Sequence, residues 1–159
     1  MIRPRLPEER MPRTPLILAV LLLAGCATNP VTGKRQLSLV SEAQEIEMGK
    51  GEVARARAET GFYPDTALEA YVARIGKAMA AASERPALPW EFHLIDDPMV
   101  NAFAAPGGFI FITRGILAYL NSEAELAGVV GHEIGHVTAK HTVAAISRQQ
   151  VGTIGILGA

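Results

Sequence analysis

The feature that most constrains this chain is the pentapeptide His-Glu-Ile-Gly-His at residues 132–136. Its two histidines are four residues apart, so in a helix they lie about 40° apart, one turn above the other. Ser122 with Glu125 is a capping-box pattern shortly before them. Apolar residues recur beside the pair at helical spacing, namely Leu126, Val129, Val130, Val137 and Ala144. We therefore predict one long helix from this cap to about residue 147, with the pentapeptide at the margin of its buried face.

This spacing carries a specific chemistry. Two histidines on one helix face can bind the same zinc ion at about 2.0–2.1 Å. Glu133 projects about 60° from His136, close enough to reach a zinc-bound water without binding the metal. Zinc lowers the pKa of such a water, and a carboxylate takes its proton as the water attacks a peptide carbonyl. The pattern predicts His132 and His136 as ligands of one zinc ion and Glu133 as the general base. The alternative is two surface histidines on a solvated helix face, which the apolar stripe disfavours.

The third zinc ligand is not evident from the motif. The longer zinc-protease motif needs glycine at position 139 and histidine at position 142, where this chain has Ala139 and Thr142. On a continuous helix His141 points about 180° away from His132, so we expect it to be a structural group or a hydrogen-bond partner rather than a ligand. By elimination, the third ligand is expected to be a Glu, Asp or His from another element. Conceivable groups without further support are Glu123, Glu125, His93 and Asp96.

Two further helices are predicted nearer the N-terminus. Ser41 with Gln44 is a second capping box and precedes a polar helix over residues 42–59. Asp65 is a suitable cap for an amphipathic helix. Its apolar positions recur every three or four residues, at Leu68, Tyr71, Val72, Ile75, Met79 and Ala82. We expect these two helices to build the core or to pack at the surface, and we assign them no catalytic role.

A pair of short strands is predicted between the second helix and the motif helix. Residues 90–94 alternate apolar and polar side chains, as a half-buried strand does. Residues 109–113 form a second apolar run, preceded by Pro106, Gly107 and Gly108. An exposed strand edge near the metal can pair with an extended peptide and present its scissile bond.

The N-terminus resembles a bacterial lipoprotein signal peptide. Four arginines precede an uncharged apolar run at residues 15–25, which is shorter than the about 20 residues that span a bilayer. Leu-Ala-Gly-Cys at residues 23–26 resembles a lipobox, which implies cleavage before Cys26, acylation of that residue and a lipid-anchored protein facing the periplasm. Ala27 in place of aspartate indicates the outer membrane. The alternatives are a chance cysteine after an ordinary signal peptide, or a short buried helix.

Composition excludes several other classes. With 49% hydrophobic and 19% charged residues, the chain is unlike disordered proteins. A net charge of -1 without a basic stripe excludes nucleic acid as a partner. The single cysteine excludes an internal disulfide framework and a cysteine-based zinc finger. We therefore divide the chain into a signal peptide (residues 1–25), a turn-rich tether (26–40) and one domain (41–159).

Three segments, in order, resemble one family. Residues 132–141 look like the active helix of the HtpX-like, CAAX-prenyl-protease-like and Oma-like zinc metallopeptidases. Residues 101–112 are similar to that family's segment before the helix, and residues 26–49 look like its bacterial lipoprotein branch. The resemblance implies an α+β, mostly helical, zincin-like domain of the gluzincin type, with a small sheet packed on the active helix. It also implies one zinc ion per chain.

The resemblance further implies a substrate site and a class of substrate. Asn101, Ala102 and Phe103, with the strand that follows, are expected to form an edge that binds an extended peptide. Gly107 and Gly108 belong either to this site or to a plain turn between strands. The expected substrates are misfolded or misassembled proteins of the bacterial cell envelope, cleaved by zinc-dependent endopeptidase activity.

One departure from the family concerns the third ligand. The family has a Glu on a helix well downstream of the motif helix, and no Asp or Glu follows Glu133 in this chain. We therefore expect residues 41–159 to be the N-terminal part of a longer peptidase domain or a truncated product, with weakened zinc binding. A second function stays open for the chain as given, namely a non-catalytic quality-control or assembly factor that binds exposed strands.

Overall fold

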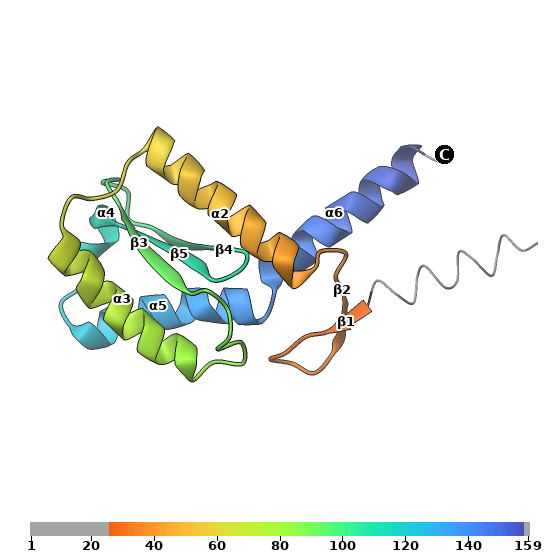
Figure 1. Ribbon diagram of the computed structural model, residues 1–159, viewed down its shortest axis with the longest axis horizontal. Coiled ribbons are helices and arrows are strands. Elements are labelled where there is room, and N and C mark those ends of the chain that lie inside the picture. Colours follow the sequence, from red (N-terminus) through yellow and green to blue (C-terminus); the bar gives the residue numbers. More distant parts are fainter. Residues whose placement is uncertain (1–25, 158–159) are drawn as a thin grey trace, which may run out of the picture.

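The computed structural model describes residues 26–157, so the predicted leader lies outside the described residues (Figure 1). The elements are the strands β1 (Cys26–Thr28) and β2 (Arg35–Leu37), the helices α2 (Glu42–Glu59) and α3 (Thr66–Ala81), the strands β3 (Glu91–Ile95), β4 (Ala102–Ala105) and β5 (Phe109–Thr113), and the helices α4 (Arg114–Leu117), α5 (Glu123–Thr138) and α6 (His141–Leu157). This arrangement confirms the predicted α+β class. In residues 26–157 no helix is both long enough and apolar enough to cross a membrane.

The three central strands form one mixed sheet in the order β3-β5-β4. β3 pairs with β5 in parallel, and β4 pairs with β5 as an antiparallel hairpin. The sequence predicted only two strands here and missed β4, because Ala-Phe-Ala-Ala has neither alternation nor β-branched residues. β5 is the central strand of this sheet, and β4 is the edge strand. The strand that follows Asn101–Phe103 in the sequence is β5, so it does not form the edge that was expected to bind a peptide.

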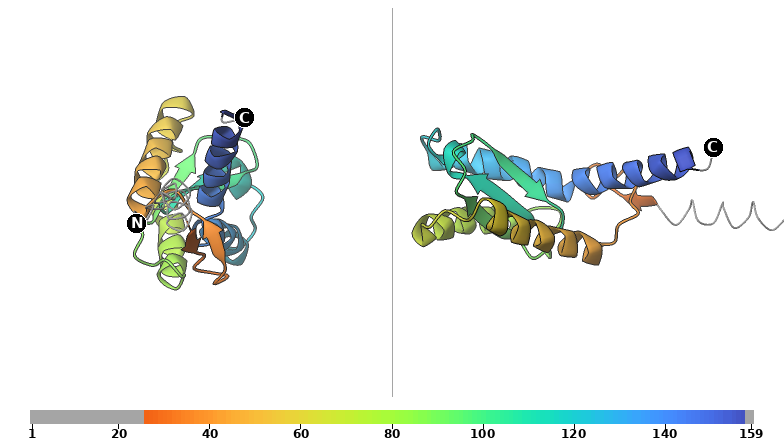
Figure 2. Two further views of the ribbon diagram at one scale, coloured as in Figure 1. Left: turned by 90° about the vertical axis from the view of Figure 1, so that its right-hand side faces the viewer. Right: turned by 90° about the horizontal axis from the view of Figure 1, so that it is seen from above.

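Helices cover both faces of the sheet (Figures 1 and 2). On one face, α3 and α5 pack against side chains of β3 and β5, in a core that includes Val72, Ile75, Phe92, Leu94, Ile110, Ile112, Val130 and Ile134. On the other face, α2 packs against Phe109 and Phe111. Gly49 permits this close approach, because a Cβ there would overlap the Phe109 ring and the Pro106 carbonyl. The motif helix is thus held directly under the sheet.

The predicted caps begin their helices. Ser41 accepts a hydrogen bond from the Gln44 amide, and the Gln44 side chain accepts one from the Ser41 amide, which completes the capping box. Ser122 likewise caps α5. Glu125, however, accepts from the Asn121 amide at 2.6 Å, one residue before the position that a capping box requires. The first residues of α2 and α5 are therefore set by local sequence.

The prediction of one long helix that reaches residue 147 is wrong, because the helix is interrupted at Lys140. α5 ends at Thr138, Lys140 adopts a left-handed backbone with φ 55°, and α6 begins at the next residue. The break has a tertiary cause. The Ala139 carbonyl accepts a hydrogen bond from the Asn29 side chain at 2.9 Å instead of from a following amide. Asn29 lies between β1 and β2, in the segment expected to be a tether, and it is buried.

One buried carboxylate joins three distant segments. Glu45 of α2 is fully buried, and it accepts from the Arg85 guanidinium at 2.8 Å and from the Lys140 ammonium at 2.7 Å. Arg85, which follows α3, also donates to the Val137 carbonyl of α5 at 3.3 Å and to Glu42 at 2.8 Å. This network therefore connects α2, the segment after α3 and the α5–α6 turn.

Replacing the buried carboxylate should destabilise the fold strongly. In Glu45→Ala the buried Arg85 guanidinium loses its buried partner and keeps only the more exposed Glu42, so we expect the free energy of unfolding to fall by about 3 kcal/mol. Glu47→Ala is the matched control, because Glu47 lies on the same helix and pairs with Lys50 at the surface. Its loss should cost less than about 1 kcal/mol. Urea unfolding of both variants measures the difference, and equal losses would contradict the role of Glu45.

Candidate metal and catalytic site

The two histidines of the motif face each other on α5. Their Nε2 atoms are 3.0 Å apart, and the rings meet edge to face with centroids 4.7 Å apart. Two imidazole nitrogens this close must share either a proton or a metal ion, because two bare lone pairs would repel. A tetrahedral zinc ion with bonds of 2.0–2.1 Å places two ligand nitrogens about 3.3 Å apart. The spacing of His132 and His136 therefore fits a zinc ion with a small adjustment.

Glu133 lies beside this pair and is buried. Burial raises the pKa of its carboxyl group above the usual range, and the nearby His136 and His132 lower it by less. A carboxyl group whose pKa is raised in this way is a stronger base once it is ionised. Its position and its pKa both suit a group that takes up a proton beside a metal ion.

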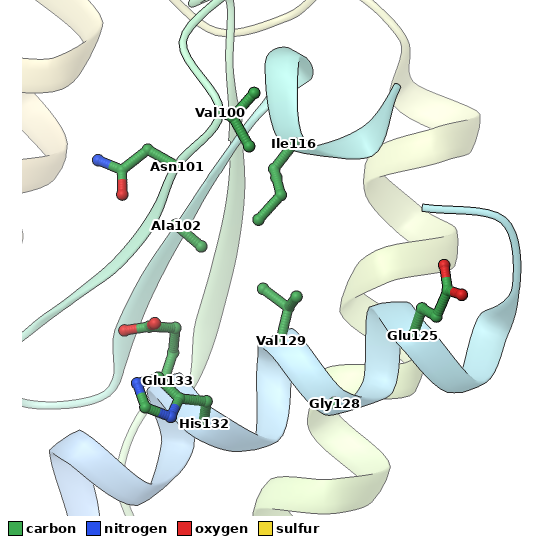
Figure 3. Close-up of a pocket in the computed structure, with 9 residues that line it drawn as sticks. All are labelled: Val100, Asn101, Ala102, Ile116, Glu125, Gly128, Val129, His132 and Glu133. Atoms are coloured by element: carbon green, nitrogen blue, oxygen red, sulfur yellow. The ribbon is translucent and has the colours of Figure 1, made fainter. Parts of the chain in front are cut away.

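A pocket of about 520 Å³ opens next to Glu133 and His132 (Figure 3). Its walls come from α5, from α4 and from the start of β4, and are formed by Val100, Asn101, Ala102, Ile116, Glu125, Gly128, Val129, His132 and Glu133. Figure 3 shows His132 and Glu133 together at one end, with Glu125 at the other. The pocket is mainly apolar away from these charged groups, which suits an uncharged stretch of peptide.

Thr113 holds the upper wall of the pocket in place. Its hydroxyl lies 2.6 Å from the Met99 carbonyl and 2.7 Å from the Asn101 carbonyl, and it accepts from the Asn101 amide at 3.2 Å. Gly115 lets the same loop approach, because a Cβ there would overlap the Pro98 carbonyl. The end of β5 thus positions the residues before β4 over the motif helix. Sequence reasoning missed Thr113, and its place at the end of an apolar strand was the only available signal.

The predicted substrate residues divide between two sides of β4. Asn101 and Ala102 line the pocket beside Glu133. Phe103 points to the other side, where it stacks on Phe111 and lines a smaller cavity of about 240 Å³ with Met48. β4 pairs only with β5, so its outer edge has no strand partner in residues 26–157.

Gly107 and Gly108 are not among the residues that line this pocket. They form the buried turn between β4 and β5, both with positive φ, 82° and 102°. A Cβ at Gly107 would lie 2.6 Å from the Ile46 Cα, and one at Gly108 would lie 3.3 Å from the Leu88 Cβ. The geometry supports the alternative interpretation, a tight turn that needs glycine.

None of the conceivable third ligands reaches the histidine pair. Glu123 accepts from the Tyr71 hydroxyl at 2.8 Å, and Glu125 from the Asn121 amide. Asp96 pairs with Arg114. His93 stacks between Phe62 and Phe111 on the α2 side of the sheet. In the part of the chain that the structure describes, no group of three His, Cys, Asp or Glu side chains is arranged to hold a metal ion.

A helix that carries two histidines and a glutamate under a small mixed sheet defines a zincin-like α+β domain. Comparison with known proteins gives the family. A profile of Peptidase family M48 matches residues 66–159, and the chain belongs to this family. The resemblance of residues 132–141 is thereby confirmed.

Several relatives show the extent of the similarity. The Beta-barrel assembly-enhancing protease of Yersinia pestis is 32% identical over 133 residues, which are 81% of this chain and 27% of that protein. The corresponding protein of Escherichia coli K12 is 32% identical over 123 residues, 77% of this chain and 25% of that protein. The Mitochondrial metalloendopeptidase OMA1 of Schizosaccharomyces pombe is 35% identical over 124 residues, 74% of this chain and 36% of that protein. The chain thus spans only about a quarter to a third of the length of these relatives.

The raised pKa of Glu133 predicts a stability effect. The group is favoured in its neutral form in the folded chain, so its contribution to stability is fully present below the unfolded pKa, near 4.5, and is lost as pH rises through the folded pKa. Glu133→Gln removes this cost, and we expect the metal-free variant to melt a few degrees higher than wild type at about pH 8.

The difference should shrink toward about pH 4, where the wild-type carboxyl group is protonated. Thermal unfolding followed by circular dichroism measures both points. Glu123→Gln, an exposed change on the same helix, is the control. A wild-type chain that is more stable than Glu133→Gln at the higher pH would contradict the burial effect.

Proposed function

We propose that this chain is the zinc-binding part of an endopeptidase of the bacterial cell envelope. The observation that carries the proposal is the 3.0 Å separation of the His132 and His136 Nε2 atoms beside buried Glu133, at the end of a pocket under a strand edge. Membership of Peptidase family M48 supports the same conclusion. We further propose one zinc ion per chain, with a third ligand outside residues 26–157.

Each residue has a role in the proposed reaction. His132 and His136 hold the zinc ion through Nε2. When bound, zinc supplies Lewis acidity that polarises the peptide carbonyl and lowers the pKa of a water molecule. Glu133 takes the proton of the attacking water and passes it to the nitrogen of the leaving amine. The outer edge of β4 aligns the substrate backbone by strand pairing, with Asn101 and Ala102 next to the scissile bond.

The substrates that we propose are misfolded or misassembled envelope proteins. An unfolded chain exposes extended backbone, which a strand edge binds with little regard to sequence. Two of the relatives are named for enhancing β-barrel assembly, which fits this substrate class. The location that we propose is that of a lipid-anchored protein facing the periplasm from the outer membrane, and the support for it is the predicted leader at residues 1–25 with Cys26 and Ala27 after it.

Cleavage of casein tests the activity, with a matched pair of variants. Glu133→Gln should lower the rate by at least about a hundredfold, because it keeps the shape of the site and removes the base. Glu123→Gln makes the same change on the same helix outside the site and should cleave like wild type. His136→Ala should lose the zinc that metal analysis finds in wild type.

Equal cleavage by wild type and Glu133→Gln would contradict the peptidase mechanism. A folded, zinc-loaded chain that binds unfolded protein through β4 but cleaves nothing would favour the second function, a strand-binding assembly factor. The binding arm uses the same casein, labelled with a fluorophore, so that both functions are measured on one substrate.

Lipid anchoring is tested at two neighbouring positions. Cys26→Ala should abolish incorporation of labelled palmitate and leave an uncleaved precursor, because the thiol that carries the lipid is lost. Ala27→Asp keeps the lipid and should move the protein from the outer to the inner membrane fraction. Palmitate labelling of Cys26→Ala at the wild-type level would contradict the lipoprotein assignment.

A further inference from the structure

His141 lies against the metal-binding pair, although it was expected on the opposite side of the helix. Its Nδ1 atom is 2.9 Å from the Nδ1 atom of His136, and the two rings meet edge to face with centroids 4.9 Å apart. The other nitrogen of His136, Nε2, faces His132. The three rings therefore form a chain in which His136 is the central member.

The break at Lys140 produces this contact. On a continuous helix, five residues turn the chain by about 140° beyond a full turn, which would carry His141 away from His136. The left-handed backbone of Lys140 instead starts α6 in a new direction and returns His141 to its neighbour.

Contacts from distant segments hold this turn. Asn29 donates to the Ala139 carbonyl, and Lys140 pairs with buried Glu45. Further along α6, buried Ser147 accepts from the Leu39 amide at 3.0 Å. These contacts with the rest of the domain therefore fix the position of His141 at the start of α6.

We propose that His141 is a positioning residue for His136. Its Nδ1 atom accepts the proton that His136 carries on Nδ1, which leaves Nε2 of His136 unprotonated and directed at the point that it shares with His132. Metal-binding histidines commonly donate their second ring nitrogen in this way, which fixes the tautomer and the ring orientation. The inference rests on the proposed zinc site, and it deepens the assignment of that site.

The same geometry excludes His141 as the third ligand of a zinc ion held between the Nε2 atoms of His132 and His136. It contacts the nitrogen on the far side of the His136 ring, away from the Nε2 pair. A ligand of the same ion would have to approach both Nε2 atoms. His141 therefore acts through His136 and not on the metal.

Three variants of the full chain, purified in detergent and stripped of metal, test the proposal. His141→Ala removes the acceptor, whereas His141→Asn restores one, because the Oδ1 atom of asparagine takes nearly the position of Nδ1 in histidine. Arg148→Ala is the control, an exposed change on the same helix. The chain contains only four histidines, so nitrogen NMR at about pH 8 can assign each tautomer.

We expect wild type, His141→Asn and Arg148→Ala to carry the His136 proton on Nδ1, and His141→Ala to show a mixture of tautomers. Zinc affinity, measured by competition with a chelating dye, should fall about 10–100-fold in His141→Ala and recover most of that loss in His141→Asn. Arg148→Ala should bind zinc like wild type.

Three outcomes would overturn the proposal. The first is a His136 proton on Nε2 in the wild-type chain. The second is a His141→Ala chain with unchanged tautomer and unchanged zinc affinity. The third is an equal loss of affinity in His141→Asn and His141→Ala with no change of tautomer, which would mean that packing alone matters. A wild-type chain that binds no zinc would refute the proposed function instead, and the metal-free tautomers would still decide the role of His141.

Discussion

The rest of the structure depends on the ion pairs that the buried carboxylate of Glu45 forms. This carboxylate neutralises Arg85 and Lys140, two cations that are 55 residues apart in the sequence. The three segments that this network joins are α2, the segment after α3 and the turn between α5 and α6. Separating them would leave a buried charge with fewer partners, which is costly. The network ends at the turn after α5. The ion pairs of Glu45 therefore tie the turn between α5 and α6 to α2, whereas apolar packing holds α5 against the sheet.

Local sequence patterns predicted most of the helices and strands, because their causes are local. Ser41 and Ser122 satisfy free amides within three residues, and the apolar run of β5 must be buried on both faces. β4 and the break at Lys140 had no such signal. β4 is a strand because the turn at Gly107 and Gly108 folds it back on β5. The left-handed backbone of Lys140 accompanies two contacts from far along the chain, the Asn29 side chain on the Ala139 carbonyl and the Glu45 carboxylate on the Lys140 ammonium group.

The candidate site divides in the same way. The histidine pair and Glu133 follow from helix geometry alone, so the sequence was sufficient to propose them. The wall of the pocket opposite them depends on Thr113, whose hydroxyl fixes a loop twelve or more residues away in the chain. His141 illustrates the limit most clearly. A correct rule for helix faces gave the wrong direction, because the helix to which it was applied ends three residues before His141.

The burial of Glu133 sets the fold against the ionised form of its carboxyl group. The apolar stripe that packs α5 against the sheet also removes the carboxyl group from water, which disfavours the ionised form that a base requires. The histidines offset only part of this cost. A divalent cation held between their Nε2 atoms would act on the same carboxylate in the same direction and more strongly. With the proposed zinc ion in place, the ionised form of Glu133 would thus be favoured.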